Sequence, residues 1–254
     1  GNVTFTGNGN LELGGVVTDL GTFTCGTGTV KYDLAGAQNI IQPTNPYFNL
    51  SLIGSTQENK TAADGTVLDV DGDFVLDGCT FNPGNNNHDL AGSWTETNSA
   101  IFDPNEGTIT FSGANSNETI TTLTNLTTSG ITIGDDNSFY QLVIDANDIT
   151  TASEIDVDNA TTINNLKKLT IGAFKADFAL ANNFTINGTL NLSDNNSEVN
   201  ANGAFDATSG FVTFGGSGIL NLHATTAFFG SAANGAAAFV KGTGTVKYLK
   251  TNNQ

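Results

Sequence analysis

Four carboxylates within a nine-residue stretch form the strongest candidate for a chemical site. Asp69, Asp71 and Asp73 alternate around Gly72, and Asp77 follows them. Ca²⁺ binds about six to eight hard oxygen ligands from a flexible turn, so this stretch resembles a calcium loop. Its glycine falls one step after the second aspartate and no glutamate closes it, unlike an EF-hand. The stretch therefore predicts either a calcium site or the plain turn of a repeat, and we expect no other cofactor.

The chain has two cysteines, Cys25 and Cys79, which are too few and too far apart in the sequence for a zinc site. Two interpretations stand side by side. The thiols are either free and buried, or they are joined in a disulfide. The rest of the composition is typical of extracellular proteins, where disulfides persist, so we expect the disulfide.

Ten Asn-x-Ser/Thr sequons are candidate N-glycosylation sites on an exposed surface. Many arise by chance in a chain so rich in asparagine and threonine. The sequons begin at Asn2, Asn49, Asn59, Asn117, Asn125, Asn159, Asn183, Asn187, Asn191 and Asn195.

Catalytic motifs are missing from the sequence. His88 and His223 are isolated from any nucleophile or metal-binding pattern, and there is no phosphate-binding loop or nucleophile elbow. Polysaccharide lyases do occur on β-helices, but they use arginine or lysine against an acidic sugar, and this chain has no arginine. We predict a protein that is not an enzyme.

The charge balance excludes several partners. The formal net charge is −17, from 25 acidic residues against eight lysines. Nucleic-acid binding depends on lysine and arginine, so no nucleic acid is expected. No run of eighteen apolar residues occurs, so we expect no membrane insertion. The chain starts at Gly1 without a signal-peptide pattern, as in a mature secreted product or a segment of a longer chain.

A five-residue box, Gly-x-Val/Ile-x-Phe/Tyr, recurs along the chain and organises it. Its two apolar residues are two positions apart, so they share one face of a strand, and the glycine indicates a turn before it. The recurrence predicts stacked repeats, with the aromatic residues pointing inward in rows. The boxes are Gly1–Phe5, Gly28–Tyr32, Gly107–Phe111, Gly210–Phe214 and Gly244–Tyr248.

The segments between the boxes also indicate short strands. YFNLSLIG (47–54) is echoed by FYQLVIDAN (139–147), downstream of a box both times. Residues 170–180 have some helical spacing, but Gly172 disfavours a helix and we expect strand there. The dipeptide Asn187-Gly188 predicts a tight turn of the hairpin type.

Thirty glycines, abundant threonine and asparagine, and seventeen phenylalanines favour an all-β protein over a helical or disordered one. We expect one elongated domain over residues 1–254, a β-solenoid (parallel β-helix) of degenerate repeats. The alternative is a β-sandwich or jelly roll, which would not need the same box and downstream strand to return.

The boxes, the two echoed strands and the segments VDGDFVL and FTINGTLNL resemble repeats of large secreted and surface-displayed prokaryotic β-helix proteins. That family supplies adhesins, stalks and sheath-like layers. The resemblance implies extracellular structural or adhesive work and transfers no active site.

Both ends of the sequence have strand patterns and no capping segment. GNVTF begins a strand at once, and GTGTVKYLKTNNQ opens a repeat that its twin at 26–40 continues. Unpaired strand edges invite pairing with another chain. We therefore expect head-to-tail self-assembly of strands within 1–14 on residues near 239–254, with Val3, Phe5, Val246 and Tyr248 in the contact. A cut from a longer solenoid would give the same pattern.

These observations predict an extracellular or cell-surface structural protein that polymerises with itself into a filament, sheath or surface layer. A monomeric adhesive or carbohydrate-binding β-helix, with surface glycans as partners, is the second hypothesis. A polysaccharide-degrading enzyme is the third.

Overall fold

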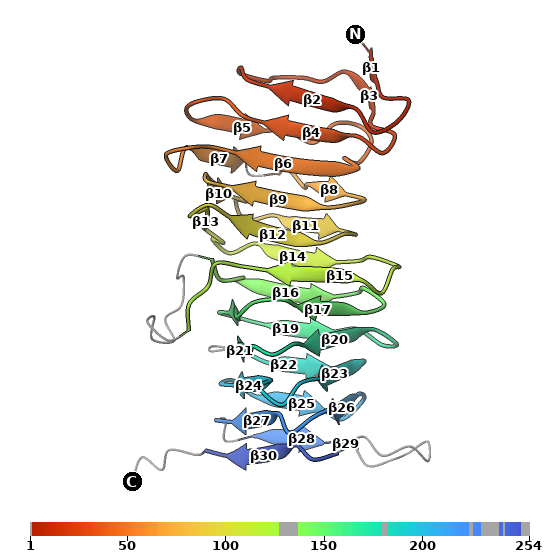
Figure 1. Ribbon diagram of the computed structural model, residues 1–254, viewed down its shortest axis with the longest axis vertical. Helices are drawn as coiled ribbons and strands as arrows, with labels where there is room; N and C mark the ends of the chain where they lie inside the picture. Colours follow the sequence, from red (N-terminus) through yellow and green to blue (C-terminus); the bar gives the residue numbers. More distant parts are fainter. Residues whose placement is uncertain are drawn as a thin grey trace.

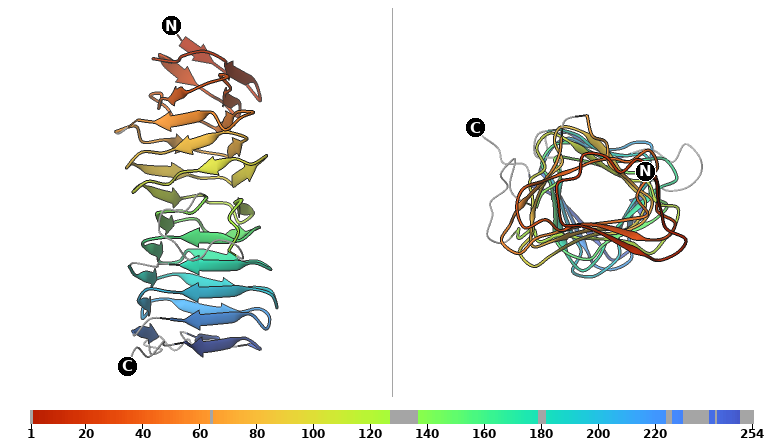
Figure 2. Two further views of the ribbon diagram at one scale, coloured as in Figure 1. Left: turned by 90° about the vertical axis from the view of Figure 1, so that its left-hand side faces the viewer. Right: turned by 90° about the horizontal axis from the view of Figure 1, so that it is seen from above.

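The chain folds into an elongated stack of coils, and the regular elements of the described residues are all short strands (Figure 1). The computed structural model describes residues 2–63, 65–126, 137–178, 182–223, 226–229, 239–240 and 242–249. Within these ranges there is no helix, and the strands form a β-solenoid of about 10 turns. Seen from above, the coils superpose around one axis (Figure 2).

Most coils carry three strands, one on each of three faces, and the strands pair in parallel with strands of neighbouring coils. The first face holds β1 (Asn2–Thr4) and β3 (Thr22–Thr24) and then an eight-stranded sheet of β8 (Asp69–Val70), β11 (Asn87–Leu90), β14 (Thr108–Phe111), β16 (Gln141–Ile144), β19 (Thr161–Ile163), β22 (Phe184–Ile186), β25 (Phe205–Ala207) and β28 (Ala227–Phe229).

The second face is one continuous sheet that runs through the whole stack. It contains eleven strands in the order β2 (Asn10–Leu13), β4 (Thr29–Tyr32), β6 (Asn49–Ile53), β9 (Phe74–Asp77), β12 (Trp94–Thr97), β15 (Glu118–Thr121), β17 (Ile149–Thr151), β20 (Lys168–Ile171), β23 (Thr189–Leu192), β26 (Phe211–Phe214) and β29 (Phe239–Val240).

The third face is divided into two sheets. The first contains β5 (Gln38–Ile40), β7 (Asn59–Ala62), β10 (Thr80–Asn82) and β13 (Ile101–Phe102), and the second contains β18 (Ile155–Val157), β21 (Lys175–Phe178), β24 (Glu198–Ala201), β27 (Ile219–Leu222) and β30 (Thr245–Tyr248).

Alternation of side chains places apolar residues inside the coils. In β6, Leu50 and Leu52 are buried and their neighbours are half-buried, as expected for a strand with one inward face. In-register stacking then builds rows in the core, such as Leu50 against Phe74 and Phe74 against Trp94. The Phe74 and Trp94 rings stack with centroids 4.5 Å apart. These rows hold the coils together through apolar burial and aromatic contacts.

The predicted solenoid is confirmed, and the sandwich alternative does not describe this chain, because every strand pair of the described residues is parallel. Residues 170–180 contribute to β20 and β21 rather than to a helix, although Leu180 lies outside the described residues. The turn at Asn187-Gly188 is also present, but it joins β22 to β23 on another face. It is a corner of a coil and makes no hairpin.

The prediction that the five boxes form stacked aromatic rows is wrong in one respect. The boxes fall on different faces: β1 and β14 on the first, β4 and β26 on the second, and β30 on the third. Tyr32, Phe111 and Phe214 are buried and Phe5 is half-buried, as predicted, whereas Tyr248 is 68% exposed. The box is therefore a strand pattern that suits any face, and it does not recur at one position of the coil.

Candidate functional site

The four aspartates predicted to bind calcium are not gathered into a metal site. Asp69 lies in β8 on the first face, while Asp77 ends β9 on the second. Asp73 Oδ1 accepts a hydrogen bond from the Ser93 amide at 2.9 Å, and Asp77 Oδ1 accepts one from Asn98 Nδ2 at 2.7 Å. No group of three or more His, Cys, Asp or Glu side chains in the described ranges is placed to hold a metal ion. The calcium prediction from these residues is wrong, because the corner spreads the carboxylates over two faces.

Asp69 instead lies beside other carboxylates across the coils. It is in register with Asp89 of the next coil. Burial, together with the charges of Asp71 and Asp89, raises the pKa of Asp69. The like charges of these neighbouring carboxylates repel one another, which accounts for part of the raised pKa of Asp69.

Cys25 and Cys79 are both buried free thiols, so the predicted disulfide is not formed. Cys25 follows β3 at the corner between the first and second faces, and its Sγ donates to the Pro46 carbonyl at 3.2 Å. Cys79 lies between β9 and β10, at a different corner and two coils further along. Stacked strands are about 4.8 Å apart, so the separation exceeds what a disulfide spans. Burial raises the pKa of Cys79 to about 12, which makes its thiol unreactive.

Nine of the ten sequon asparagines are at least partly exposed, and Asn159 is the exception. Asn159 is buried, and its Oδ1 accepts a hydrogen bond from Asn182 Nδ2. A glycan at Asn159 would therefore disrupt the fold. The others are either exposed (Asn2, Asn59, Asn117, Asn125, Asn183, Asn195) or half-buried (Asn49, Asn187, Asn191).

Several polar side chains point into the core, which the sequence did not predict. His88 is buried in β11, where Nδ1 accepts from the Leu68 amide at 3.0 Å and Nε2 lies 2.9 Å from the Pro83 carbonyl. Lys60 Nζ donates to the Leu34 carbonyl at 2.8 Å and to Gln38 Oε1 at 3.0 Å. Their alternation with apolar neighbours was the available signal, because it places them on the inward face of a strand.

Glu96 is another of these buried polar groups. Its Oε1 accepts from Trp94 Nε1 at 2.9 Å, and its Oε2 accepts from the Leu123 amide at 2.8 Å. Burial raises the pKa of Glu96 to about 8 despite these two hydrogen bonds. Trp94 and the Leu123 backbone thus hold the Glu96 carboxyl group inside the core of this coil.

The four residues predicted to mediate assembly lie at opposite ends of the stack, on two different faces. Val3 and Phe5 belong to the first-face strand β1 and the residue after it, and both are half-buried. Val246 and Tyr248 belong to β30 on the third face. They could not pair directly in a continuing solenoid, because stacked strands share a face.

The C-terminal coil carries an apolar cavity of about 320 Å³. It is lined by Phe229, Phe239, Val246 and Tyr248, which come from the three strands β28, β29 and β30. The Phe229 and Phe239 rings meet edge to face at 5.7 Å. A cavity formed by the inward side chains of a coil is the surface on which a further coil would pack. The sequence indicates Val246 and Tyr248 here but not the two phenylalanines, because AFF and AAAFV show no alternation.

Comparisons with protein-family models, curated proteins and solved structures find no match for this chain. No helix in the described ranges is long and apolar enough to cross a membrane.

Proposed function

We propose that this chain is an extracellular structural β-solenoid that stacks head to tail on further copies of itself into a filament or layer. The observation that carries the proposal is the second-face sheet. Among the described strands, β2 has a neighbour on one side only, and so does β29 at the far edge of the same sheet. These are the segments from which the sequence predicted the contact.

The two edges are complementary in direction and face. Each coil runs from the first face to the second and then to the third, so a copy placed below β28, β29 and β30 would bring β1 under β28 and β2 under β29. Both new pairs are parallel, like all the pairs inside the stack. This heterologous contact repeats without closing when its rotation matches that of the solenoid, which gives a filament.

The ends are also complementary in polarity. At the N-terminal end, Val3, Phe5, Leu11 and Leu13 are half-buried apolar side chains that pack against the core on one side only. At the C-terminal end, the described residues Phe229, Phe239, Val246 and Tyr248 line the apolar cavity described above. Bringing the two together would remove apolar surface from water at about 25 cal/mol per Å².

The hydrogen bonds of β2 identify the atoms available to a second copy. The Thr29 amide donates to the Gly9 carbonyl at 2.9 Å. In a parallel ladder, alternate residues bond to the same side, so Asn10 and Glu12 direct their amides and carbonyls away from β4. Glu12 is exposed, and its side chain lies 3.6 Å from Lys31 Nζ.

The test removes the backbone N–H that Glu12 directs away from β4. Glu12→Pro removes the outward N–H without removing a bond to β4, and proline at an edge blocks strand addition. Glu12→Gln is the matched control, because it loses the same charge and the Lys31 ion pair but keeps the amide. Sedimentation velocity of the wild type and Glu12→Gln is expected to show a series of species heavier than the monomer, and Glu12→Pro is expected to sediment as the monomer. A monomeric wild type, or equal assembly of the two variants, would overturn the proposal.

A further inference from the structure

The corner between the first and second faces has two hollows on its surface. The segments that turn from the first face to the second line two adjoining hollows, of about 620 and 400 Å³, which share Ser116. We name them together the corner groove. Its first part is lined by Asp73, Ser93 and residues 114–118, and its second part by Ser116, Asn147, Asp148, residues 165–168, residues 187–189 and Phe211.

The lining residues come from successive coils, so the groove follows the solenoid axis. Asp73 and Ser93 precede β9 and β12, residues 114–117 precede β15, and Asp148 precedes β17. Residues 165–167 precede β20, and Phe211 begins β26. A ligand fitted to this shape is extended and crosses several coils.

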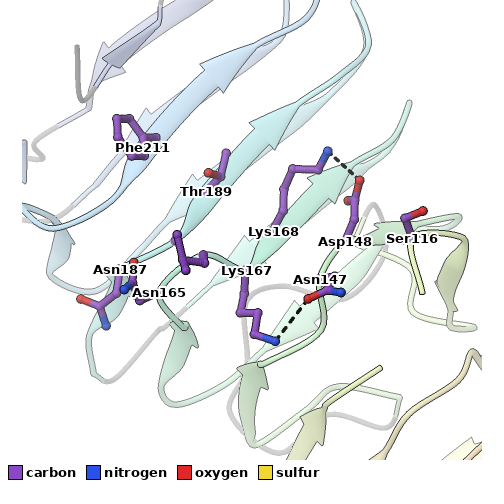
Figure 3. A pocket seen from close by; sticks show the side chains of 11 residues that line it. Ser116, Asn147, Asp148, Asn165, Lys167, Lys168, Asn187, Thr189 and Phe211 are labelled. Carbon is purple, nitrogen blue, oxygen red and sulfur yellow. Dashed lines mark hydrogen bonds and ion pairs between the residues drawn. The ribbon is translucent and has the colours of Figure 1, made fainter. Parts of the chain in front are cut away.

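The second part of the groove combines an exposed aromatic ring with paired polar groups (Figure 3). Lys168, Thr189 and Phe211 are in register on three successive strands of the second face. The Phe211 side chain is outward-facing and 37% exposed, whereas most phenylalanines of this protein are in the core. Beside it, Lys168 Nζ lies 2.6 Å from Asp148 Oδ2, and Lys167 Nζ lies 3.4 Å from Asn147 Oδ1.

This combination suits a sugar ring. A pyranose has an apolar C–H face that packs on an aromatic ring, and hydroxyls that both donate and accept hydrogen bonds. The Lys168–Asp148 pair and the amides of Asn147, Asn165 and Asn187 supply donors and acceptors side by side. The hollow of about 400 Å³ is within the size range of small-molecule sites.

The charges of the groove favour a neutral ligand. Its lining contains the carboxylates Asp73, Asp148 and Glu118 and the ammonium groups Lys167 and Lys168, so the two signs nearly balance. The whole chain has a formal net charge of −17, which repels a polyanion at long range.

We propose that the corner groove binds a neutral polysaccharide laid along the solenoid axis, with Phe211 stacked on one of its sugar rings. This site does not involve the ends of the stack, so it stands or fails independently of head-to-tail assembly.

Affinity gel electrophoresis tests the proposal with the full chain in gels containing soluble β-glucan, mannan or dextran, and with alginate as the polyanionic comparison. We expect retardation by at least one neutral polymer, unchanged by added salt. Phe211→Ala should weaken that retardation about tenfold in apparent affinity, because the stacking surface is lost.

The matched control is Phe174→Ala, because Phe174 is also 37% exposed but lies between β20 and β21, at another corner. It should bind like the wild type. Circular dichroism and the thermal midpoint of each variant separate a lost contact from a lost fold. Retardation by alginate alone, by no neutral polymer, or equally in Phe211→Ala and Phe174→Ala would overturn the proposal.

Discussion

At the scale of single residues, Glu96 is a carboxyl group whose environment in the core differs strongly from water. It is held in the core by Trp94 Nε1 and the Leu123 amide, and burial raises its pKa to about 8. In the folded protein Glu96 is therefore protonated at pH 7, while in the unfolded chain it ionises near pH 4.5.

This difference predicts a pH dependence of stability with a definite sign. A carboxyl group with a raised folded-state pKa contributes its full stability below about pH 4.5 and loses it as the pH rises to about 8. The free energy of unfolding is expected to fall by up to about 1.4 kcal/mol per pH unit in this window. Glu96→Gln should remove that fall, as measured by urea unfolding at pH 5 and pH 8.

Glu106→Gln is the control, because Glu106 is exposed. It should follow the wild type at both pH values. A difference between wild type and Glu96→Gln that is the same at pH 5 and pH 8 would contradict the assigned protonation.

At the scale of elements, aromatic contacts in the core join neighbouring coils in several parts of the stack. Phe184 of β22 lies 4.5 Å from the Phe178 ring and 5.6 Å from the Phe205 ring, so it bridges coils as well as faces. Phe184→Ala is expected to lower the free energy of unfolding by about 3–5 kcal/mol through lost burial and a cavity. Urea unfolding measures this loss.

Phe174→Ala again supplies the comparison, with an expected loss of under about 1 kcal/mol at its partly exposed position. If the two substitutions lower the free energy of unfolding by the same amount, the aromatic rows do not hold the coils together as the structure indicates.

The strands themselves could be predicted from the sequence, because alternation and glycine turns are local features. YFNLSLIG became β6, with Leu50 and Leu52 inward, and FYQLVIDAN became β16, with Leu142 and Ile144 inward. Their assignment to the faces could not be predicted. All three faces use the same alternating pattern, so the pattern does not indicate the face on which a strand lies. The box at Gly28–Tyr32 and its twin at Gly244–Tyr248, for example, lie on different faces.

The candidate sites were harder to predict for a related reason. A site in a solenoid gathers residues about one coil apart in the sequence, such as Lys168, Thr189 and Phe211. The calcium prediction relied on residues close in sequence, and the corner between β8 and β9 separated them. The distance between Cys25 and Cys79 likewise depends on the number of coils between them, which the boxes alone did not specify.

At the scale of the whole molecule, the solenoid is a one-dimensional object, in which each coil contacts only its neighbours. Its sides consist of turns and of outward side chains that are mostly polar. Its end coils differ from the sides: among the described strands, β2 and β29 are the outermost of the second-face sheet, and Phe229 and Phe239 line an apolar cavity. End-to-end stacking would cover these features and leave the corner groove accessible along the filament.

Electron microscopy of the purified wild-type chain tests the central claim most directly, with strand spacing from fibre diffraction of the same sample. We predict unbranched rods one solenoid wide, in lengths that are multiples of one subunit, with a reflection along the rod axis at about 4.8 Å from the stacked strands. Particles of one subunit length at every concentration, or rods whose strands run along the axis, would contradict head-to-tail stacking of the solenoid.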